Sequence, residues 1–125
     1  MTPPMIGHFL IVGVGGAVGA MLRHGVGLAS LRLWGPHFPW GTLAVNILGG
    51  LLMGILVGVL AARGGSEQLR LLLGVGVLGG FTTFSAFSLD VVTMIGRGAM
   101  LTALGYILAS VIASVGALYL GKALV

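Results

Sequence analysis

Four long apolar runs follow one another along this chain, and charged residues or prolines separate them. Each run is close to the ~20 apolar residues that an α-helix needs to span a bilayer. The membrane spans expected from these runs are about 5–32, 40–62, 69–96 and 98–122. The connections are too short to fold on their own. The pattern therefore predicts one all-α domain over residues 1–125, an integral membrane protein with four transmembrane helices.

The third run contains an irregular segment. Residues 79–88 read G-G-F-T-T-F-S-A-F-S, with paired glycines and paired threonines in the middle of an apolar span. Glycine and β-branched residues weaken a helix, so we expect a break in mid-membrane at 79–83. Broken membrane helices recur at ion sites, because freed carbonyls bind cations and helix N-termini favour anions. A simple packing kink is the alternative.

Composition narrows the class of protein. The chain is 58% hydrophobic and 6% charged, whereas a soluble domain carries about 25% charged residues. Its net charge of +4 comes from basic residues scattered singly, which excludes the clustered patch that nucleic-acid binding needs. Cysteine is absent, and the sequence contains no recognisable nucleophile–base set or metal cluster, so we do not expect an enzyme. Residues 1–5 lack a basic residue, so we expect the first run to be retained.

Charge counting bears on orientation. Four spans put both termini on one side, and three basic residues fall on each side: Arg63, Arg70 and Lys122 against Arg23, Arg32 and Arg97. The positive-inside rule then gives no preferred orientation. Either a weak bias is hidden by the chosen boundaries, or copies insert both ways and pair antiparallel about an axis in the membrane plane. Small residues at every fourth position, as at 42–58 and 105–121, favour close helix packing and oligomerisation.

Polar side chains inside a membrane span are costly and often functional. Asn46 either forms a hydrogen bond between packed helices or offers N–H donors to a solute. Tyr106, Ser110 and Ser114 form a stripe of hydroxyls in the last span. Each serine either bonds its own i−4 carbonyl or lines a polar track. Arg23, which follows the first run, would ordinarily extend to the headgroups.

Two phenylalanines share a face of the helix that follows the expected break. Phe84 and Phe87 are three residues apart. Aromatic pairs in a membrane ordinarily make lipid or core contacts. A ring also has an electropositive edge, however, so a ring turned edge-on could face an anion.

Three segments in order resemble the Fluc (CrcB) fluoride channel family. Residues 15–23 read G-G-A-V-G-A-M-L-R and are similar to the family pattern G-G-x-x-G-A-x-x-R. Residues 41–49 read G-T-L-A-V-N-I-L-G and resemble G-T-L-x-V-N-x-x-G. Residues 79–87 read G-G-F-T-T-F-S-A-F and resemble G-G-x-T-T-F-S-T-F. The resemblance covers nearly the whole chain.

The resemblance implies an antiparallel, dual-topology homodimer in the cell membrane, with two pores that passively export fluoride from the cytoplasm. It implies that the pores are lined by Asn46, Phe84, Ser85, Phe87, Tyr106, Ser110 and Ser114. Arg23 would lie in the pore vestibule. Backbone carbonyls of Gly79 and Thr82 would hold a central structural sodium ion. The implied partners are fluoride, membrane lipid and a second copy of the chain.

One departure and one rival function complete the expectations. Ala86 stands where the family usually has threonine, which removes a hydroxyl from the pore-lining helix. The rival is a small multidrug-type transporter, which also has four spans and dual topology. Cation–proton exchange needs a carboxylate inside the membrane. The only two acids are Glu67, in a loop, and Asp90, near the end of the third span, so we disfavour this function.

Overall fold

The computed structural model describes residues 2–125 and is all-helical over that range. Four stretches are long and apolar enough to cross a membrane: Pro3–Trp34, Trp40–Arg63, Glu67–Gly96 and Met100–Ala123. They confirm the prediction of four transmembrane helices. The elements along them are α1 (Pro3–Trp34), α2 (Trp40–Arg63), α3 (Glu67–Leu69), η1 (Arg70–Leu78), α4 (Gly79–Phe81), α5 (Phe84–Gly96) and α6 (Met100–Ala123).

Each span lies within two residues of the predicted bounds at either end. The longest, α1, runs through Arg23 to Trp34, in line with the predicted bound at 32. Two helices end at a glycine with positive φ: Gly35 (76°) after α1 and Gly64 (74°) after α2. A side chain is disfavoured in that conformation, so glycine is the residue that turns the chain there.

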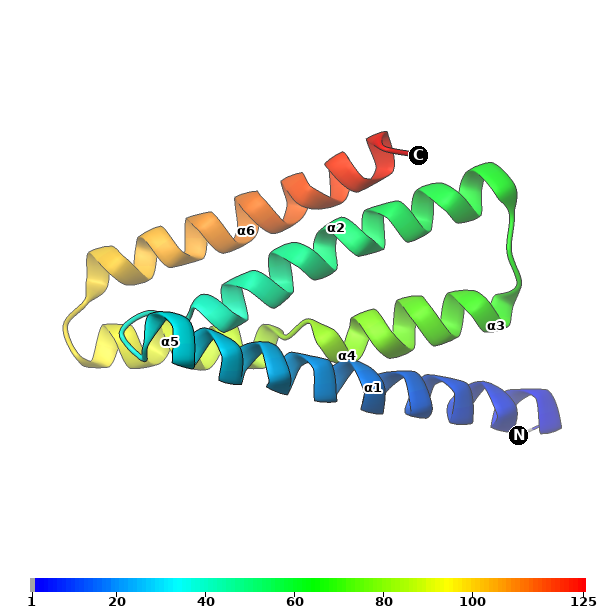
Figure 1. The fold of residues 1–125 in the computed structure, drawn as a ribbon, viewed down its shortest axis with the longest axis horizontal. Helices are drawn as coiled ribbons and strands as arrows, with labels where there is room; N and C mark the ends of the chain where they lie inside the picture. Colours follow the sequence, from blue (N-terminus) through cyan, green and yellow to red (C-terminus); the bar gives the residue numbers. More distant parts are fainter. Residues whose placement is uncertain (1) are drawn as a thin grey trace.

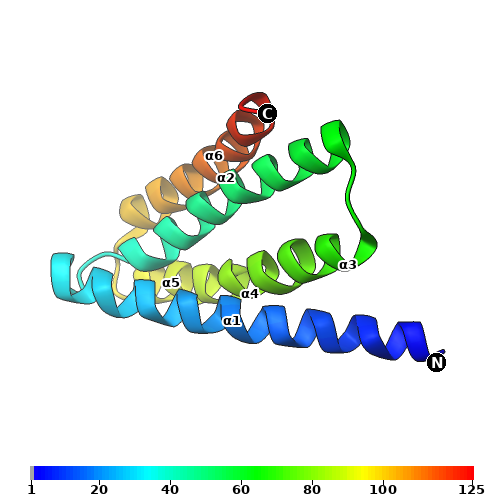
Figure 2. The same ribbon diagram turned by 45° about the vertical axis from the view of Figure 1, so that its right-hand side comes forward.

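The four spans form an up-and-down bundle with both termini at the same end (Figure 1). The connection from α2 to α3 lies at that end, and the connections α1–α2 and α5–α6 lie at the other (Figure 1). α2 packs along α6, while α1 packs along η1 and α4. Figure 2 shows the same two pairs of neighbours from another direction.

Glycines set how closely these pairs approach. A Cβ at Gly54 would lie 3.0 Å from the Leu118 Cα, and a Cβ at Gly15 would lie 3.0 Å from the Gly76 Cα. Backbone therefore meets backbone, as is typical of membrane helices with small residues at their contacts. The predicted stripe of small residues at 105–121 in the last span does not pack along its whole length. Gly121 packs on α2, but Gly105 is exposed and has nothing within 4 Å of its Cβ position.

The third span is not one regular helix. Its first part, η1, is a π-helix, and the Gly79 N–H donates to the Gly74 carbonyl five residues earlier. Gly79, Gly80 and Phe81 are helical, and extended backbone follows at Thr82 (φ −86°, ψ 158°) and Thr83 (φ −150°, ψ 121°). The irregular backbone is thus narrower than the predicted 79–83. The π-helix was not anticipated from the sequence.

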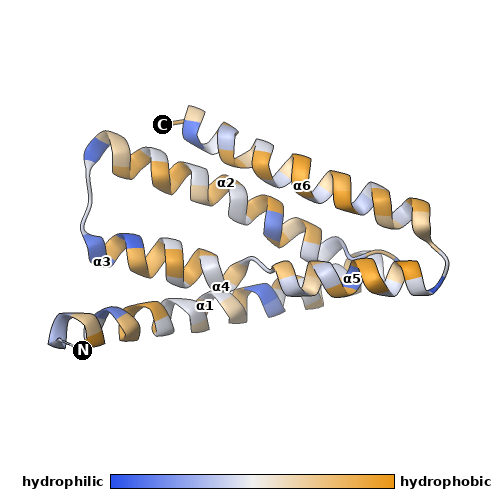
Figure 3. Ribbon diagram, turned by 180° about the vertical axis from the view of Figure 1, so that it is seen from behind, coloured by the Kyte–Doolittle hydropathy of each residue, from blue (hydrophilic) through white to orange (hydrophobic). Residues whose placement is uncertain are grey.

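The chain by itself leaves much apolar surface uncovered. Its buried aromatic and aliphatic cluster is small and consists of Phe87, Met94, Ala103 and Tyr106. Leu101 and Phe84, by contrast, are 84% and 78% exposed. Apolar colour predominates along the helices on the side seen in Figure 3, and hydrophilic positions gather at the helix ends, with a few along α1 and α2. Such a surface suits lipid or another membrane helix and not water.

Candidate functional site

An open groove of about 410 Å³ runs between α2, the extended segment, α5 and α6. Five of the predicted pore residues line it: Asn46, Phe84, Phe87, Ser110 and Ser114. They come from α2, α5 and α6, so the fold brings together residues that are far apart in the sequence. Tyr106 and Ser85 do not line this groove.

The two phenylalanine rings lie against each other at the start of α5. Their centroids are 5.5 Å apart and their planes are inclined by 47°. Phe87 is 7% exposed and belongs to the buried cluster, whereas Phe84 is 78% exposed. Phe84 therefore stands at the open side of the groove, where no other part of the chain covers it.

The serine hydroxyls of α6 are buried without partners. Neither Ser110 Oγ nor Ser114 Oγ has a hydrogen-bond partner within residues 2–125. The alternative that each serine bonds its own i−4 carbonyl is therefore not what the structure contains. A buried hydroxyl without a partner costs about 1–3 kcal/mol. Two such groups in one groove point to a ligand that accepts or donates hydrogen bonds.

Asn46 forms hydrogen bonds with the backbone of Thr83. Thr83 belongs to the extended segment Thr82–Thr83 that interrupts the third span, called the break below. The Asn46 Nδ2 donates to the Thr83 carbonyl at 3.0 Å, and the Thr83 N–H donates to the Asn46 Oδ1 at 2.7 Å. The interhelical hydrogen bond considered from the sequence is thus present. An amide nitrogen carries two hydrogens, so Asn46, which lines the groove, has a second N–H that makes no hydrogen bond within residues 2–125.

These bonds change which carbonyls of the break have donors. A continuous helix would direct the Thr83 N–H at the Gly79 carbonyl, but Asn46 takes it instead. The Ala86 N–H likewise donates to Thr83 Oγ1 at 3.0 Å, and not to the Thr82 carbonyl. The carbonyls of Gly79 and Thr82 therefore lose the donors that a regular helix provides. These are the two carbonyls predicted to bind sodium.

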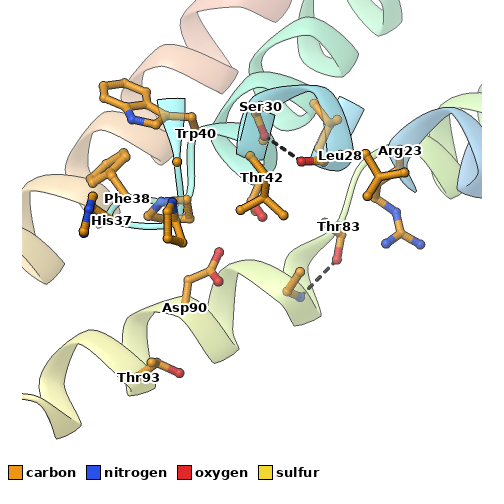
Figure 4. A pocket seen from close by; sticks show the side chains of 18 of the residues that line it. Arg23, Leu28, Ser30, His37, Phe38, Trp40, Thr42, Thr83, Asp90 and Thr93 are labelled. Carbon is orange, nitrogen blue, oxygen red and sulfur yellow. Dashed lines mark hydrogen bonds between the residues drawn. The ribbon is translucent and has the colours of Figure 1, made fainter. Parts of the chain in front are cut away.

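A second cavity, of about 480 Å³, opens toward the end of the bundle that holds the α1–α2 loop. Arg23, Thr42, Asp90 and Arg97 are among its lining residues, so the predicted vestibule residue does face a cavity. Figure 4 shows Asp90 directed from α5 into this hollow, below Thr42. Thr83 lines both this cavity and the groove, which places the break between them.

Tyr106 is linked to the second cavity by a hydrogen bond to Asp90, which lines that cavity. Tyr106 is 1% exposed, and its hydroxyl donates to Asp90 Oδ2 at 2.8 Å. Its ring lies 5.2 Å from that of Phe87 and, edge-on, 5.4 Å from that of Phe38. Tyr106 therefore joins α5, α6 and the α1–α2 loop.

Three site residues were missed from the sequence: Thr42, Thr83 and Asp90. Asp90 was noted only as an acid near the end of a span. Its rarity was the available signal, because the chain has two acids and an acid in a membrane helix usually has a partner. Ser85 is exposed, and its Oγ lies 3.3 Å from Thr83 Oγ1, so it adjoins the break without lining the groove.

Comparison with known proteins adds an independent finding. Residues 10–122 match the family of CrcB-like proteins, described as Camphor Resistance (CrcB). The chain is 54% identical over 114 residues to the fluoride-specific ion channel FluC of Mesorhizobium japonicum, with 91% of this chain and 92% of that protein covered. It is 58% identical over 114 residues to the protein of that name from Phenylobacterium zucineum, with 90% of each covered.

Proposed function

Because the chain belongs to the CrcB-like protein family, we propose that it is one subunit of a passive, fluoride-selective channel and not an enzyme. Four spans make it a multi-pass protein of the cell membrane. The observation that carries the proposal is the pair of buried, unpartnered hydroxyls of Ser110 and Ser114 in the groove beside Phe84 and Phe87. The names of relatives from several bacteria support fluoride as the ion.

The groove offers donors without a fixed charge. A small anion that enters must exchange its water for hydrogen-bond donors, here the serine hydroxyls and the free N–H of Asn46. A phenylalanine edge adds a weak positive field. Neither arginine nor lysine lines the groove, so binding stays weak enough for the anion to leave. Arg23 and Arg97 line the second cavity instead, which we take as the pore vestibule. There their positive charge raises the local anion concentration.

The path we propose runs from the vestibule, past Thr83, into the groove. Thr83 is the lining residue at the break that both cavities share. Tyr106 acts at this point through Asp90, which it holds by a hydrogen bond, and it does not line the groove. Fluoride leaving the cytoplasm would follow its own gradient along this path, with no coupled ion.

A second subunit completes the channel in this proposal. The groove is open on one side, and Phe84 is exposed there. An antiparallel copy would cover that side and create two equivalent pores related by an axis in the membrane plane. With Arg23 inside α1, three basic residues at one end of the bundle stand against two at the other, a small difference that supports insertion in both orientations.

A structural sodium ion fits the break between the subunits. Gly79 and Thr82 present carbonyl oxygens that have lost their helical donors, and unwound carbonyls of this kind bind sodium in other membrane proteins. Gly79 is exposed on the face of the single subunit, so a partner's carbonyls could share the ion. The bound ion would supply positive charge that offsets the cost of anions nearby.

Liposomes containing the purified protein test the function. With a fluoride gradient, and with valinomycin letting potassium leave alongside the anion to balance the charge, we expect rapid fluoride efflux and little chloride efflux. Neither a proton gradient nor a sodium gradient should change the rate except through electrical driving force. Equal release of chloride and fluoride would overturn the assignment. Fluoride movement that required a proton gradient would favour the transporter alternative.

A further inference from the structure

Arg23 forms a long-range hydrogen bond to the backbone of the third span. Its Nε donates to the Gly80 carbonyl at 3.1 Å, across 57 positions of sequence. The residue lies well inside α1 and not at its end, because α1 continues to Trp34. It is also partly buried. Extension of this side chain to the headgroups, its ordinary fate, is therefore not what the structure has.

Glycines on the same face of α1 bring the arginine within reach. Gly16 lies against Gly80, where an added Cβ would be 3.0 Å from the Gly16 Cα. A Cβ at Gly19 would lie 2.8 Å from the Phe81 nitrogen. Arg23 follows Gly19 by one helical turn and continues this face. The spacing of residues 15–23 thus has a physical reason. The glycines let the α1 backbone contact the third span, and one turn later the Arg23 side chain bonds the Gly80 carbonyl of that span.

The Gly80 carbonyl needs an outside donor. In an unbroken helix it would accept from the N–H of Phe84. Here Phe84 begins α5, after extended backbone at Thr82 and Thr83. An unpaired carbonyl at membrane depth is costly. The arginine supplies the missing donor, and a charged donor makes the stronger kind of hydrogen bond.

We propose that Arg23 is a positioning residue that holds the break from the α1 side, as Asn46 holds it from the α2 side. Together they bond the carbonyls of Gly80 and Thr83, and so fix the backbone that would present the Gly79 and Thr82 carbonyls to a cation. The last part rests on the proposed function. The role in holding the break does not.

A competing explanation is that Arg23 acts only through its charge, because it also lines the vestibule. Three substitutions separate the two roles. Glutamine places its Nε2 the same number of bonds from Cα as the arginine Nε, so Arg23→Gln keeps the donor and removes the charge. Arg23→Lys keeps the charge but has a methylene at the position of the donor. Arg23→Met keeps neither.

Hydrogen–deuterium exchange on the purified full-length protein tests the proposal without reference to transport. In the peptide covering residues 78–84, Arg23→Gln should exchange within about threefold of wild type. Arg23→Lys and Arg23→Met should exchange at least about tenfold faster there, because the break opens more often. Peptides from α2 and α6 around Gly54 and Leu118 should be unchanged and serve as the internal control.

Two further readouts complete the experiment. Stabilisation by sodium, measured as the rise in Tm between potassium and sodium buffers, should be kept by Arg23→Gln and reduced by Arg23→Lys. Fluoride efflux should follow the same order. If Arg23→Lys matches wild type while Arg23→Gln exchanges fast or does not fold, the proposal is overturned and charge is the role. It is also overturned if all three variants exchange like wild type. If wild type passes no fluoride but the exchange order holds, the proposed function fails and the positioning role stands.

Discussion

The hydroxyl of Tyr106 in α6 donates a 2.8 Å hydrogen bond to the carboxylate of Asp90 in α5. Tyr106 is almost fully buried, and Asp90 lines the vestibule. The bond therefore links the packed interior to the cavity at the proposed pore entrance. It also gives one of the two acids of the chain a defined partner near the end of the third span.

Removal of this bond should cost stability as well as transport. Tyr106→Phe deletes the hydroxyl and leaves the carboxylate without its donor, which we expect to lower the free energy of unfolding by about 1–3 kcal/mol. Asp90→Asn is the matched control, because its Oδ1 still accepts from Tyr106, and it should lose less. Denaturation in detergent measures both variants. A Tyr106→Phe protein as stable as wild type would show that the bond is not important for folding.

Phe84→Ile tests the ring edge in isolation. Isoleucine keeps the apolar character but lacks the positive edge of the ring. Because Phe84 is 78% exposed in the single chain, its replacement should leave the packing of the four helices intact while fluoride efflux falls by at least about tenfold. Phe87→Ile should also reduce efflux, but it additionally loses about 1–3 kcal/mol of packing because Phe87 is buried. Full efflux from folded Phe84→Ile would rule out the ring-edge mechanism.

Ser110→Ala and Ser114→Ala should separate function from stability. The hydroxyls are buried without partners within residues 2–125, so their removal relieves a desolvation penalty of about 1–3 kcal/mol. We expect Tm to stay constant or rise while fluoride efflux falls. Ser110→Thr, which retains a hydroxyl, is the control for flux. A clear loss of stability in the alanine variants would mean that the hydroxyls serve the fold instead.

Gly54→Ala should disturb the contact between α2 and α6. The new Cβ would lie 2.9 Å from the carbonyl carbon of Leu118, closer than real Cβ contacts allow. We expect a loss of about 1–3 kcal/mol in unfolding free energy. Gly105→Ala is the control, because nothing lies within 4 Å of its Cβ position in the subunit. Equal stability of the two variants would contradict the packing described for α2 and α6.

Orientation can be tested with tags and added charge. If copies insert both ways, a C-terminal reporter should be accessible from both sides of the membrane. Lysines at Ala62 and Gln68 should bias insertion one way, and lysines at Leu33 and Met100 the other; all four positions are exposed at the bundle ends. Each biased variant alone should lose fluoride efflux, and co-expression of the two should restore it. A wild-type reporter confined to one side would refute dual topology.

Much of the fold follows from the sequence for a simple reason. In a bilayer, a helix must be about 20 apolar residues long and must satisfy its own backbone. The four runs met that condition and predicted their bounds to within two residues. The paired threonines also indicated the irregular backbone, which the structure places at Thr82 and Thr83. The π-helix before them left no pattern in the sequence, because its residues are as apolar as those of a regular helix.

The candidate site was likewise predictable from the sequence only in part. The sequence alone determined which residues are polar inside a span, since each such residue is conspicuous among apolar neighbours: Asn46, Ser110 and Tyr106 were recognised on that basis. Only the tertiary structure decided their partners. It pairs Asn46 with Thr83, Arg23 with Gly80 and Tyr106 with Asp90. Within residues 2–125 it leaves the hydroxyls of Ser110 and Ser114 without a partner. Periodicity gives the face of a helix on which a residue lies. Which faces meet, and at what height, depends on how closely glycine backbones approach and on the shift of register that the π-helix introduces.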